Sequence, residues 1–251
     1  MKDYFSAQSS QYKTFRPTYQ EELFSFLFSH VNEKEYAWDC GTGNGQVAVE
    51  LAKQFTKVYA TDISRQQLSE APARNNIEYS VQKAENVSFP DNGFDLVTVA
   101  QAIHWFNINK FYDEVQRTLK TDGLIAVIGY GLVQSFPESD KIISHFYQNI
   151  VGNFWDYERK YLDEKYQTLP FPFREIKTPE FCRAYKWSFD QLIGYLNTWS
   201  PVQNYKKQKG SNPVDLIFED LKSCWGDEVR PVRFPVFLRL GRLDKKPLNM
   251  L

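Results

Sequence analysis

The chain has 251 residues, and its 30 lysines and arginines nearly balance its 31 aspartates and glutamates. This length suits one α/β domain with an insertion, and the charge balance argues against a nucleic-acid binder that works by neutralising phosphates. The sequence lacks a membrane-length apolar run and a signal-peptide pattern, and its three cysteines are isolated. We therefore expect a cytoplasmic protein with no metal, nucleic acid or membrane as partner.

Strand-like and helix-like segments alternate over the first 130 residues, which is the pattern of βαβ units in a parallel sheet. A capping box formed by Thr18 and Glu21 predicts a first helix that begins at Thr18. Further helices are expected after residue 46, after Ser64 and over 108–119. The strands are expected at residues 36–38, 58–61, 77–81, 94–99 and 124–128.

The alternation ends after residue 130. The aromatic-rich segment 131–178 carries helical patterns and is predicted to form a cap near the carboxyl ends of the strands, where such folds bind ligands. The cluster of Lys206, Lys207 and Lys209 is expected in a solvated loop. Helices are expected at 190–198 and 213–225. Two late strands, at 181–188 and 232–240, predict an antiparallel edge pair.

The loop from Asp39 to Gly45 has glycines at alternate positions between a strand and an amphipathic helix. Its G-x-G-x-G spacing differs from the G-x-G-x-x-G of dinucleotide sites, and the preceding acid, Asp39, suits an ammonium better than a diphosphate. Asp62 ends the next strand, where ribose hydroxyls need an acceptor. These acids predict a cationic nucleoside without phosphate, S-adenosylmethionine. The alternative is a tight glycine turn followed by an aspartate that caps a helix.

The chain resembles the class I S-adenosylmethionine-dependent methyltransferases of the methyltransferase type 11 group, and within it the trans-aconitate methyltransferase-like branch. The matching motifs are Tyr12-x-x-x-Arg16-Pro17-x-Tyr19, the glycine loop, Ala84-Glu85, Phe89-Pro90-Asp91-x-x-Phe94-Asp95, Ala102-x-His104-Trp105-Phe106 and Thr198-Trp199-Ser200. This resemblance implies an α/β fold: a Rossmann-like, seven-stranded, mostly parallel sheet with an antiparallel edge pair, helices on both faces and a helical cap after strand five. Within one domain, 1–251, we expect an N-terminal lid and helix at 1–35 and a cofactor-binding core at 36–130. A cap insertion is expected at 131–178, and the part that completes the sheet at 179–251.

The resemblance also implies which residues hold the cofactor. The backbone of Gly41 and Gly43 would face its methionine part, with Asp39 near the ammonium and the Tyr12/Arg16 segment as a lid. Lys83 stands where related enzymes often carry an acid, which leaves backbone groups or Glu85 to recognise the adenine. The full expected set is Tyr12, Arg16, Asp39, Gly41, Gly43, Asp62, Ile63, Ala84, Glu85 and Gln101.

The branch resemblance points to O-methylation of a small acid, which gives a methyl ester. A carboxylate is already ionised at neutral pH and needs no general base, whereas a phenol, alcohol or amine benefits from one. His104 is the candidate base beside Trp105, and both are expected to be catalytic; a purely structural His104 is the alternative. Arg16, Arg159 or Arg174 could bind an anionic acceptor. A non-catalytic S-adenosylmethionine-binding protein is the alternative from another functional class.

Overall fold

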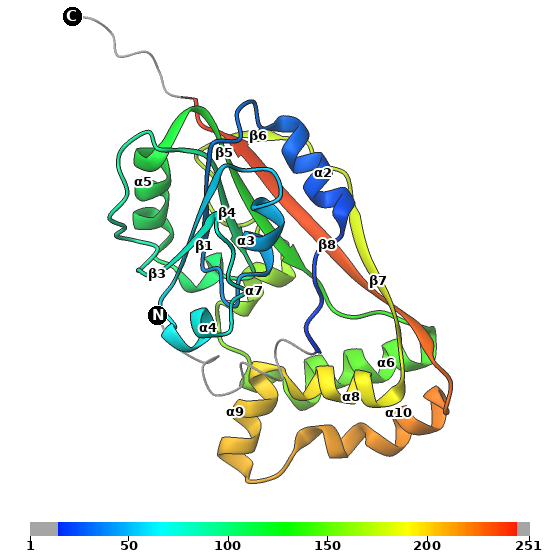
Figure 1. The fold of residues 1–251 in the computed structure, drawn as a ribbon. Coiled ribbons are helices and arrows are strands. Elements are labelled where there is room, and N and C mark those ends of the chain that lie inside the picture. The colour runs from blue at the N-terminus through cyan, green and yellow to red at the C-terminus, as the bar shows by residue number, and fades with distance from the viewer. Residues whose placement is uncertain (1–14, 245–251) are drawn as a thin grey trace, which may run out of the picture.

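The computed structural model describes residues 15–244, and a mixed β-sheet runs through their centre (Figure 1). The strands are β1 (Tyr36–Cys40), β2 (Lys57–Asp62), β3 (Ile77–Val81), β4 (Phe94–Ala100), β5 (Leu119–Tyr130), β6 (Arg174–Ile176), β7 (Phe181–Trp187) and β8 (Arg230–Arg242). Their spatial order is β3-β2-β1-β4-β5-β8-β6, and β7 also pairs with β8. The five strands β1 to β5 run parallel to one another, as the alternating sequence pattern predicted.

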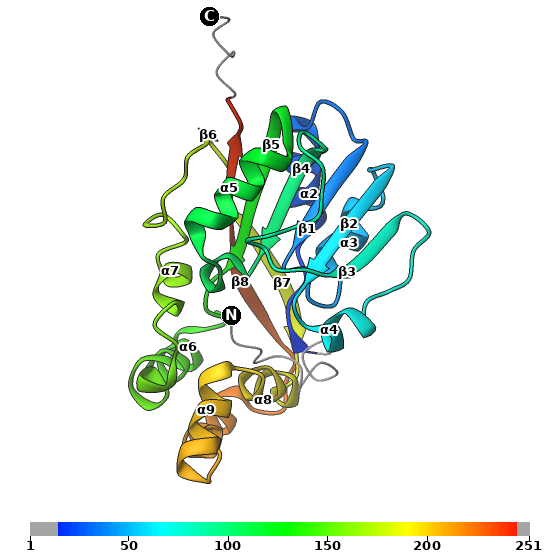
Figure 2. The same ribbon diagram turned by 90° about the vertical axis from the view of Figure 1, so that its left-hand side faces the viewer.

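Helices cover both faces of the sheet. They are α2 (Glu21–His30), α3 (Gln46–Leu51), α4 (Arg65–Ser69), α5 (Ile108–Thr118), α6 (Pro137–His145), α7 (Arg159–Asp163), α8 (Phe189–Asn197), α9 (Ser200–Lys209) and α10 (Phe218–Trp225). Shorter helical turns are η2 (Ile103–Trp105), η3 (Phe146–Ile150), η4 (Gly152–Phe154) and η5 (Pro213–Ile217). Figure 2 shows α5 on one face of the sheet, and α2 and α3 on the other.

The pleat of the strands divides the core into two buried layers. Ala37 and Leu96 pack in the layer with α2 and α3, whereas their chain neighbours Trp38 and Val97 pack in the layer with α5. Successive strand residues point to opposite faces, so a strand covered on both sides is apolar at nearly every position. The expected helices on both faces are therefore confirmed by the packing.

The antiparallel edge predicted from the two late strands is present and includes one strand more than expected. β8 is antiparallel to β5 along one side, and its other side pairs with β7 near its start and with β6 near its end. Two strands thus share the outermost position of the sheet. β6 was not predicted from the sequence because three residues are too few to show an alternating pattern.

Two local predictions about helices are wrong. The first described long helix begins at Glu21, with Gln20 as its N-cap, because the backbone N–H of Thr18 donates instead to the Tyr185 hydroxyl (2.7 Å). Lys206 and its neighbouring lysines lie in the last turn of α9 rather than in a loop. Only Pro201 and Val202 of α9 are buried, so its sequence carries no apolar period, while basic residues suit a helix carboxyl end.

A helical layer lies beyond the carboxyl ends of the parallel strands, where Figure 1 shows α6, α8, α9 and α10 gathered together. α10 packs against α6, and α9 packs against η4. The layer therefore joins part of the predicted cap, residues 131–178, to the later segment 188–229. These two segments are separate in the sequence because β6 and β7 return to the sheet edge between them.

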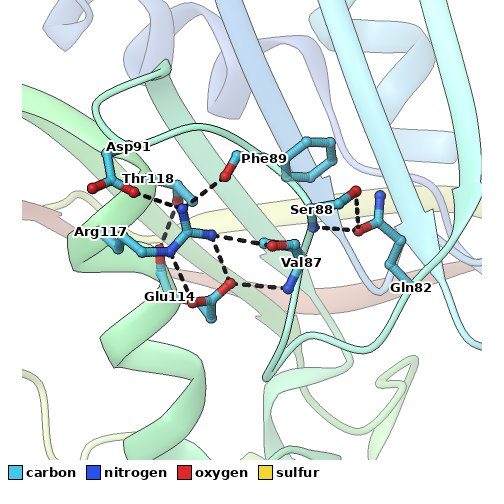
Figure 3. A network of polar contacts seen from close by, with 8 residues as sticks. All are labelled: Gln82, Val87, Ser88, Phe89, Asp91, Glu114, Arg117 and Thr118. Carbon is cyan, nitrogen blue, oxygen red and sulfur yellow. Dashed lines mark hydrogen bonds and ion pairs between the residues drawn. The ribbon is translucent and has the colours of Figure 1, made fainter.

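Arg117 fixes the long connection between β3 and β4 to helix α5 (Figure 3). Its guanidinium donates to the carbonyl oxygens of Val87 (3.2 Å) and Phe89 (2.7 Å) and to the carboxylates of Asp91 (2.8 Å) and Glu114 (2.9 Å). Glu114 also accepts the backbone N–H of Val87 (2.9 Å), and the pKa of Glu114 is lowered mainly by its bonds from Arg117. The connection is thus held by charge-assisted hydrogen bonds rather than by regular structure.

Replacement of Arg117 by methionine should lower the free energy of unfolding by about 2 kcal/mol, because two backbone carbonyls and Glu114 lose a charged donor. Arg174→Met is the matched control. Arg174 is exposed and pairs only with Asp244 among the described residues, so its loss should change stability by less than about 0.5 kcal/mol. Urea denaturation of the two variants measures the difference, and equal stabilities would contradict this role of Arg117.

Candidate active site

A cavity opens at the carboxyl ends of β1, β2 and β4. β1 lies between β2 and β4, so the chain leaves β1 toward α3 on one face and leaves β4 toward α5 on the other. This reversal of strand order creates the crevice in which α/β folds bind ligands. The lining of this first cavity brings together seven residues expected from the sequence, Arg16, Asp39, Gly41, Gly43, Asp62, Ile63 and Gln101.

The glycine loop bends back over the end of β1. Gly41 and Gly43 adopt φ values of 65° and 55°, in the left-handed region that favours glycine. The backbone N–H of Gly43 donates to Oδ2 of Asp62 (2.9 Å), and that of Ser64 donates to Oδ1 (2.8 Å). Asp62 therefore joins the first glycine turn to the start of α4 while its carboxylate still borders the cavity.

Asp39 is a buried carboxylate at the end of β1, with 1% of its surface exposed. Oδ2 accepts from the Thr42 hydroxyl (2.5 Å), and Oδ1 accepts from the Thr98 hydroxyl (2.7 Å). Burial raises the pKa of Asp39 to about 6, and the two hydroxyl bonds oppose that rise. A cation placed beside this carboxylate would compensate for the lost hydration.

Arg16 ties the N-terminal segment to the cavity. Its guanidinium donates to the Tyr130 hydroxyl (3.1 Å) and to the carbonyl oxygen of Thr198 (3.0 Å). Gln101 lies opposite at the end of β4, with φ at 53°, and donates from Nε2 to the carbonyl of Tyr130 (3.2 Å). Tyr130 had no sequence motif, although a tyrosine that ends a buried apolar strand is a usable signal. Tyr12 lies outside the described residues.

Ala84 and Glu85 are not among the described residues that line the first cavity. Ala84 is buried, and Oε1 of Glu85 accepts the backbone N–H of Asn107 (2.9 Å), at the start of α5. The carboxylate of Glu85 is therefore used to hold the loop against α5. Cys40 is also buried, and burial raises the pKa of its thiol, which suits a packing residue rather than a nucleophile.

A second, more polar cavity adjoins the first and shares Arg16, Gln101 and Trp105 with it. The remaining side chains of this second cavity come from η2 and the helical layer: His104, Trp155, Asp156, Arg159 and Ser200. Asp156 was missed because it belongs to no motif, and only the folded cap brings it to this position. Arg174, considered as a candidate from the sequence, is absent from the described lining of both cavities.

His104 is buried, and its Nδ1 lies 2.8 Å from the Tyr166 hydroxyl. Burial, together with a smaller effect of the Arg159 charge, lowers the pKa of His104 to about 3. The imidazole is therefore neutral at physiological pH. A base with so low a pKa removes a proton poorly, so the buried environment of His104 does not favour it as a general base.

Across residues 15–244, no group of three or more His, Cys, Asp or Glu side chains is arranged to hold a metal ion. Over the same residues, no helix is long and apolar enough to cross a membrane.

Gly41→Ala should destabilise the fold more than Gly43→Ala. Both substitutions put a side chain in the left-handed region, which costs about 1 kcal/mol, but a Cβ at Gly41 would lie 2.7 Å from Cβ of Ala102. A Cβ at Gly43 would meet its nearest neighbour, Gln67, at 3.9 Å. We expect a further loss of about 1–3 kcal/mol at Gly41, measured by thermal unfolding. Similar unfolding temperatures for the two variants would contradict the close approach.

Comparison with known proteins shows the family of the chain. A family model described as "Methyltransferase domain" matches residues 38–127. A Dictyostelium discoideum protein whose name places it among the methyltransferases is 36% identical over 251 residues, covering 96% of this chain and 95% of that protein. The ubiquinone/menaquinone biosynthesis C-methyltransferase UbiE of Rickettsia massiliae is 30% identical over 193 residues, covering 68% of this chain and 75% of the relative.

The solved structure of a protein from Anaeromyxobacter dehalogenans, described by name as a type II methyltransferase, superposes with a TM-score of 0.84. The two sequences are 33% identical, and the superposition covers 91% of this chain and 98% of the Anaeromyxobacter chain. Similarity along almost the whole chain extends from the sheet to the helical layer. The chain therefore belongs to the class I S-adenosylmethionine-dependent methyltransferases, and S-adenosylmethionine is its cofactor.

Proposed function

We propose that the enzyme methylates a carboxylate of a small organic acid and releases a methyl ester. The observation that carries this proposal is the second cavity, which places the guanidinium groups of Arg16 and Arg159 beside the first cavity. The motifs shared with the trans-aconitate methyltransferase-like branch favour the same class of acceptor.

The first cavity fits the cofactor by the chemistry of its side chains. Asp39 offers a buried carboxylate for the ammonium, and Asp62 offers carboxylate oxygens for the ribose hydroxyls. The open space at Gly43, where a Cβ would have no neighbour within 3.4 Å, lets a ligand approach the backbone. When bound, S-adenosylmethionine supplies an electrophilic methyl group on its sulfonium.

Arg159 is oriented as an anion-binding group. Its Nε donates to the Tyr147 hydroxyl (2.9 Å) and to Oδ1 of Asp163 (3.2 Å), and its guanidinium lies 4.4 Å from the ring centroid of Trp155. Within the described part of the chain, no hydrogen bond engages Nη1 or Nη2. This leaves one edge of a planar fork available to a carboxylate, the ligand that matches its geometry.

The residues around this fork perform the work that ester formation requires. A carboxylate arrives ionised, so no side chain has to remove a proton, and the low pKa of His104 is no obstacle. Trp105 borders both cavities and helps to exclude water between them. Catalysis then consists of holding the acceptor oxygen in line with the methyl group.

Two other functions are less well supported. Methylation of a phenol, alcohol or amine would need a base, and His104 is poorly suited to that task. C-methylation, the activity in the name of the Rickettsia relative, also begins with removal of a proton from the acceptor. A protein that binds S-adenosylmethionine without catalysis would show binding and no turnover.

The direct test is transfer of a labelled methyl group from S-adenosylmethionine to panels of carboxylic acids, phenols and amines. We expect product only with acids, and we expect base to release the label as methanol. Arg159→Met should reduce kcat/KM for the best acid about 10- to 100-fold, because a charged hydrogen-bonding group is lost. Arg174→Met, outside both cavities, is the control and should match the wild type. Transfer to phenols or amines alone would contradict the proposal.

Cofactor binding should depend on the ionisation of Asp39. Because its pKa is raised to about 6, this carboxyl is protonated in the free protein at lower pH and has no charge to offer the ammonium. The Kd of S-adenosylhomocysteine should therefore fall as the pH rises from about 5 to 7 and then level off, as calorimetry can measure. Asp39→Asn should bind more weakly, with no such change. A flat wild-type profile would contradict this role.

A further inference from the structure

His104 lines the second cavity, and one of its two ring nitrogens is engaged by the protein. Nδ1 lies 2.8 Å from the Tyr166 hydroxyl. Within the described residues, no hydrogen bond engages Nε2. The second ring nitrogen of a histidine that lines a polar cavity is thus available to a ligand.

Tyr166 is held firmly enough to fix its hydroxyl. The side chain is 1% exposed, and its ring stacks beside that of His104 with the centroids 5.8 Å apart. Its backbone N–H donates to the carbonyl oxygen of Tyr161 (2.6 Å), and its own carbonyl oxygen accepts from Nη1 of Arg239 (2.7 Å). The hydroxyl position therefore follows from the packing of the cap against β8.

The direction of the hydrogen bond follows from the chemistry of its two partners. A phenol with a pKa near 10 is a stronger donor than a neutral imidazole N–H, and an imidazole nitrogen is a stronger acceptor than a phenol oxygen. The Tyr166 hydrogen should thus lie in the bond, with the lone pair of Nδ1 accepting it. A neutral imidazole carries its single hydrogen on the other nitrogen.

We propose that Tyr166 holds His104 in the tautomer with hydrogen on Nε2, and that this N–H donates to an oxygen atom of the acceptor in the second cavity. This inference rests on the acceptor site proposed above and assigns His104 there as a neutral donor instead of a base. Tyr166 acts through His104 and is a positioning residue.

The surrounding charges favour this state. Arg159 lines the same cavity, and its charge opposes a second proton on the imidazole. Arg16 and Asp156 line this cavity as well. The two arginine guanidinium groups and the Nε2–H of His104 together form a set of hydrogen-bond donors. Such a set suits a methyl-accepting substrate that is rich in oxygen atoms. An amine acceptor would meet donors where it needs acceptors, so the same set discriminates against amines.

The tautomer can be observed directly by NMR with 15N-labelled histidine. The sequence has three histidines, so His104→Gln identifies the signals of His104. In the complex with S-adenosylhomocysteine, we expect hydrogen on Nε2, a bare Nδ1 and no titration between about pH 5 and 8. Hydrogen on Nδ1, or titration in this range, would overturn the proposal. Tyr166→Phe should mix the two tautomers.

Kinetics test whether the donor is used. His104→Leu should raise KM for the best acid about 10-fold or more, because an acceptor oxygen loses its partner. His104→Gln places an amide N–H near the position of Nε2 and should recover most of the loss. Equal KM values for the two variants would overturn the donor role. If no acid accepts a methyl group, the proposed function fails, and the NMR measurement alone decides the tautomer.

Discussion

The active site depends on a buried carboxylate at the point where the sheet reverses its strand order. Asp39 ends β1, the strand between β2 and β4, and its oxygens accept hydroxyl bonds from Thr98 on β4 and Thr42 in the glycine loop. These two bonds join the loop to the neighbouring strand across the crevice. They also satisfy a carboxylate that would otherwise be costly to bury. The loop shape and the charge that we propose is offered to the cofactor therefore share one origin.

The proposed acceptor site is built differently, from segments that are remote in the sequence. The second cavity takes Arg16 from the N-terminal segment, His104 and Trp105 from the turn after β4, and Arg159 from the cap. Two of these groups are held by other side chains, Arg159 by Tyr147 and Asp163, and His104 by Tyr166. Such support from a second layer of residues is what fixes a polar site in one geometry.

Elements that depend on local chemistry could be predicted from the sequence, whereas those that depend on packing could not. The glycine loop needs positive φ values, so its position was evident, and the parallel strands were evident as buried apolar runs. Helix α9 has almost no buried face, and β6 is too short for a pattern, so neither was foreseen. The carboxylate of Glu85, which the resemblance places near the adenine, accepts the backbone N–H of Asn107 at the start of α5. The residue type alone does not tell whether such a carboxylate will bind a ligand or a nearby backbone N–H.

The sequence by itself determined the α/β fold and the cofactor, because these follow from strand alternation, glycine spacing and acids placed at strand ends. Only the tertiary structure decided which side chains line the proposed acceptor site. It brought Asp156 and Arg159 to the second cavity, left Arg174 exposed and buried His104 against Tyr166. The ionisation of a histidine depends on its burial and on neighbouring charges, and contacts between distant segments set both.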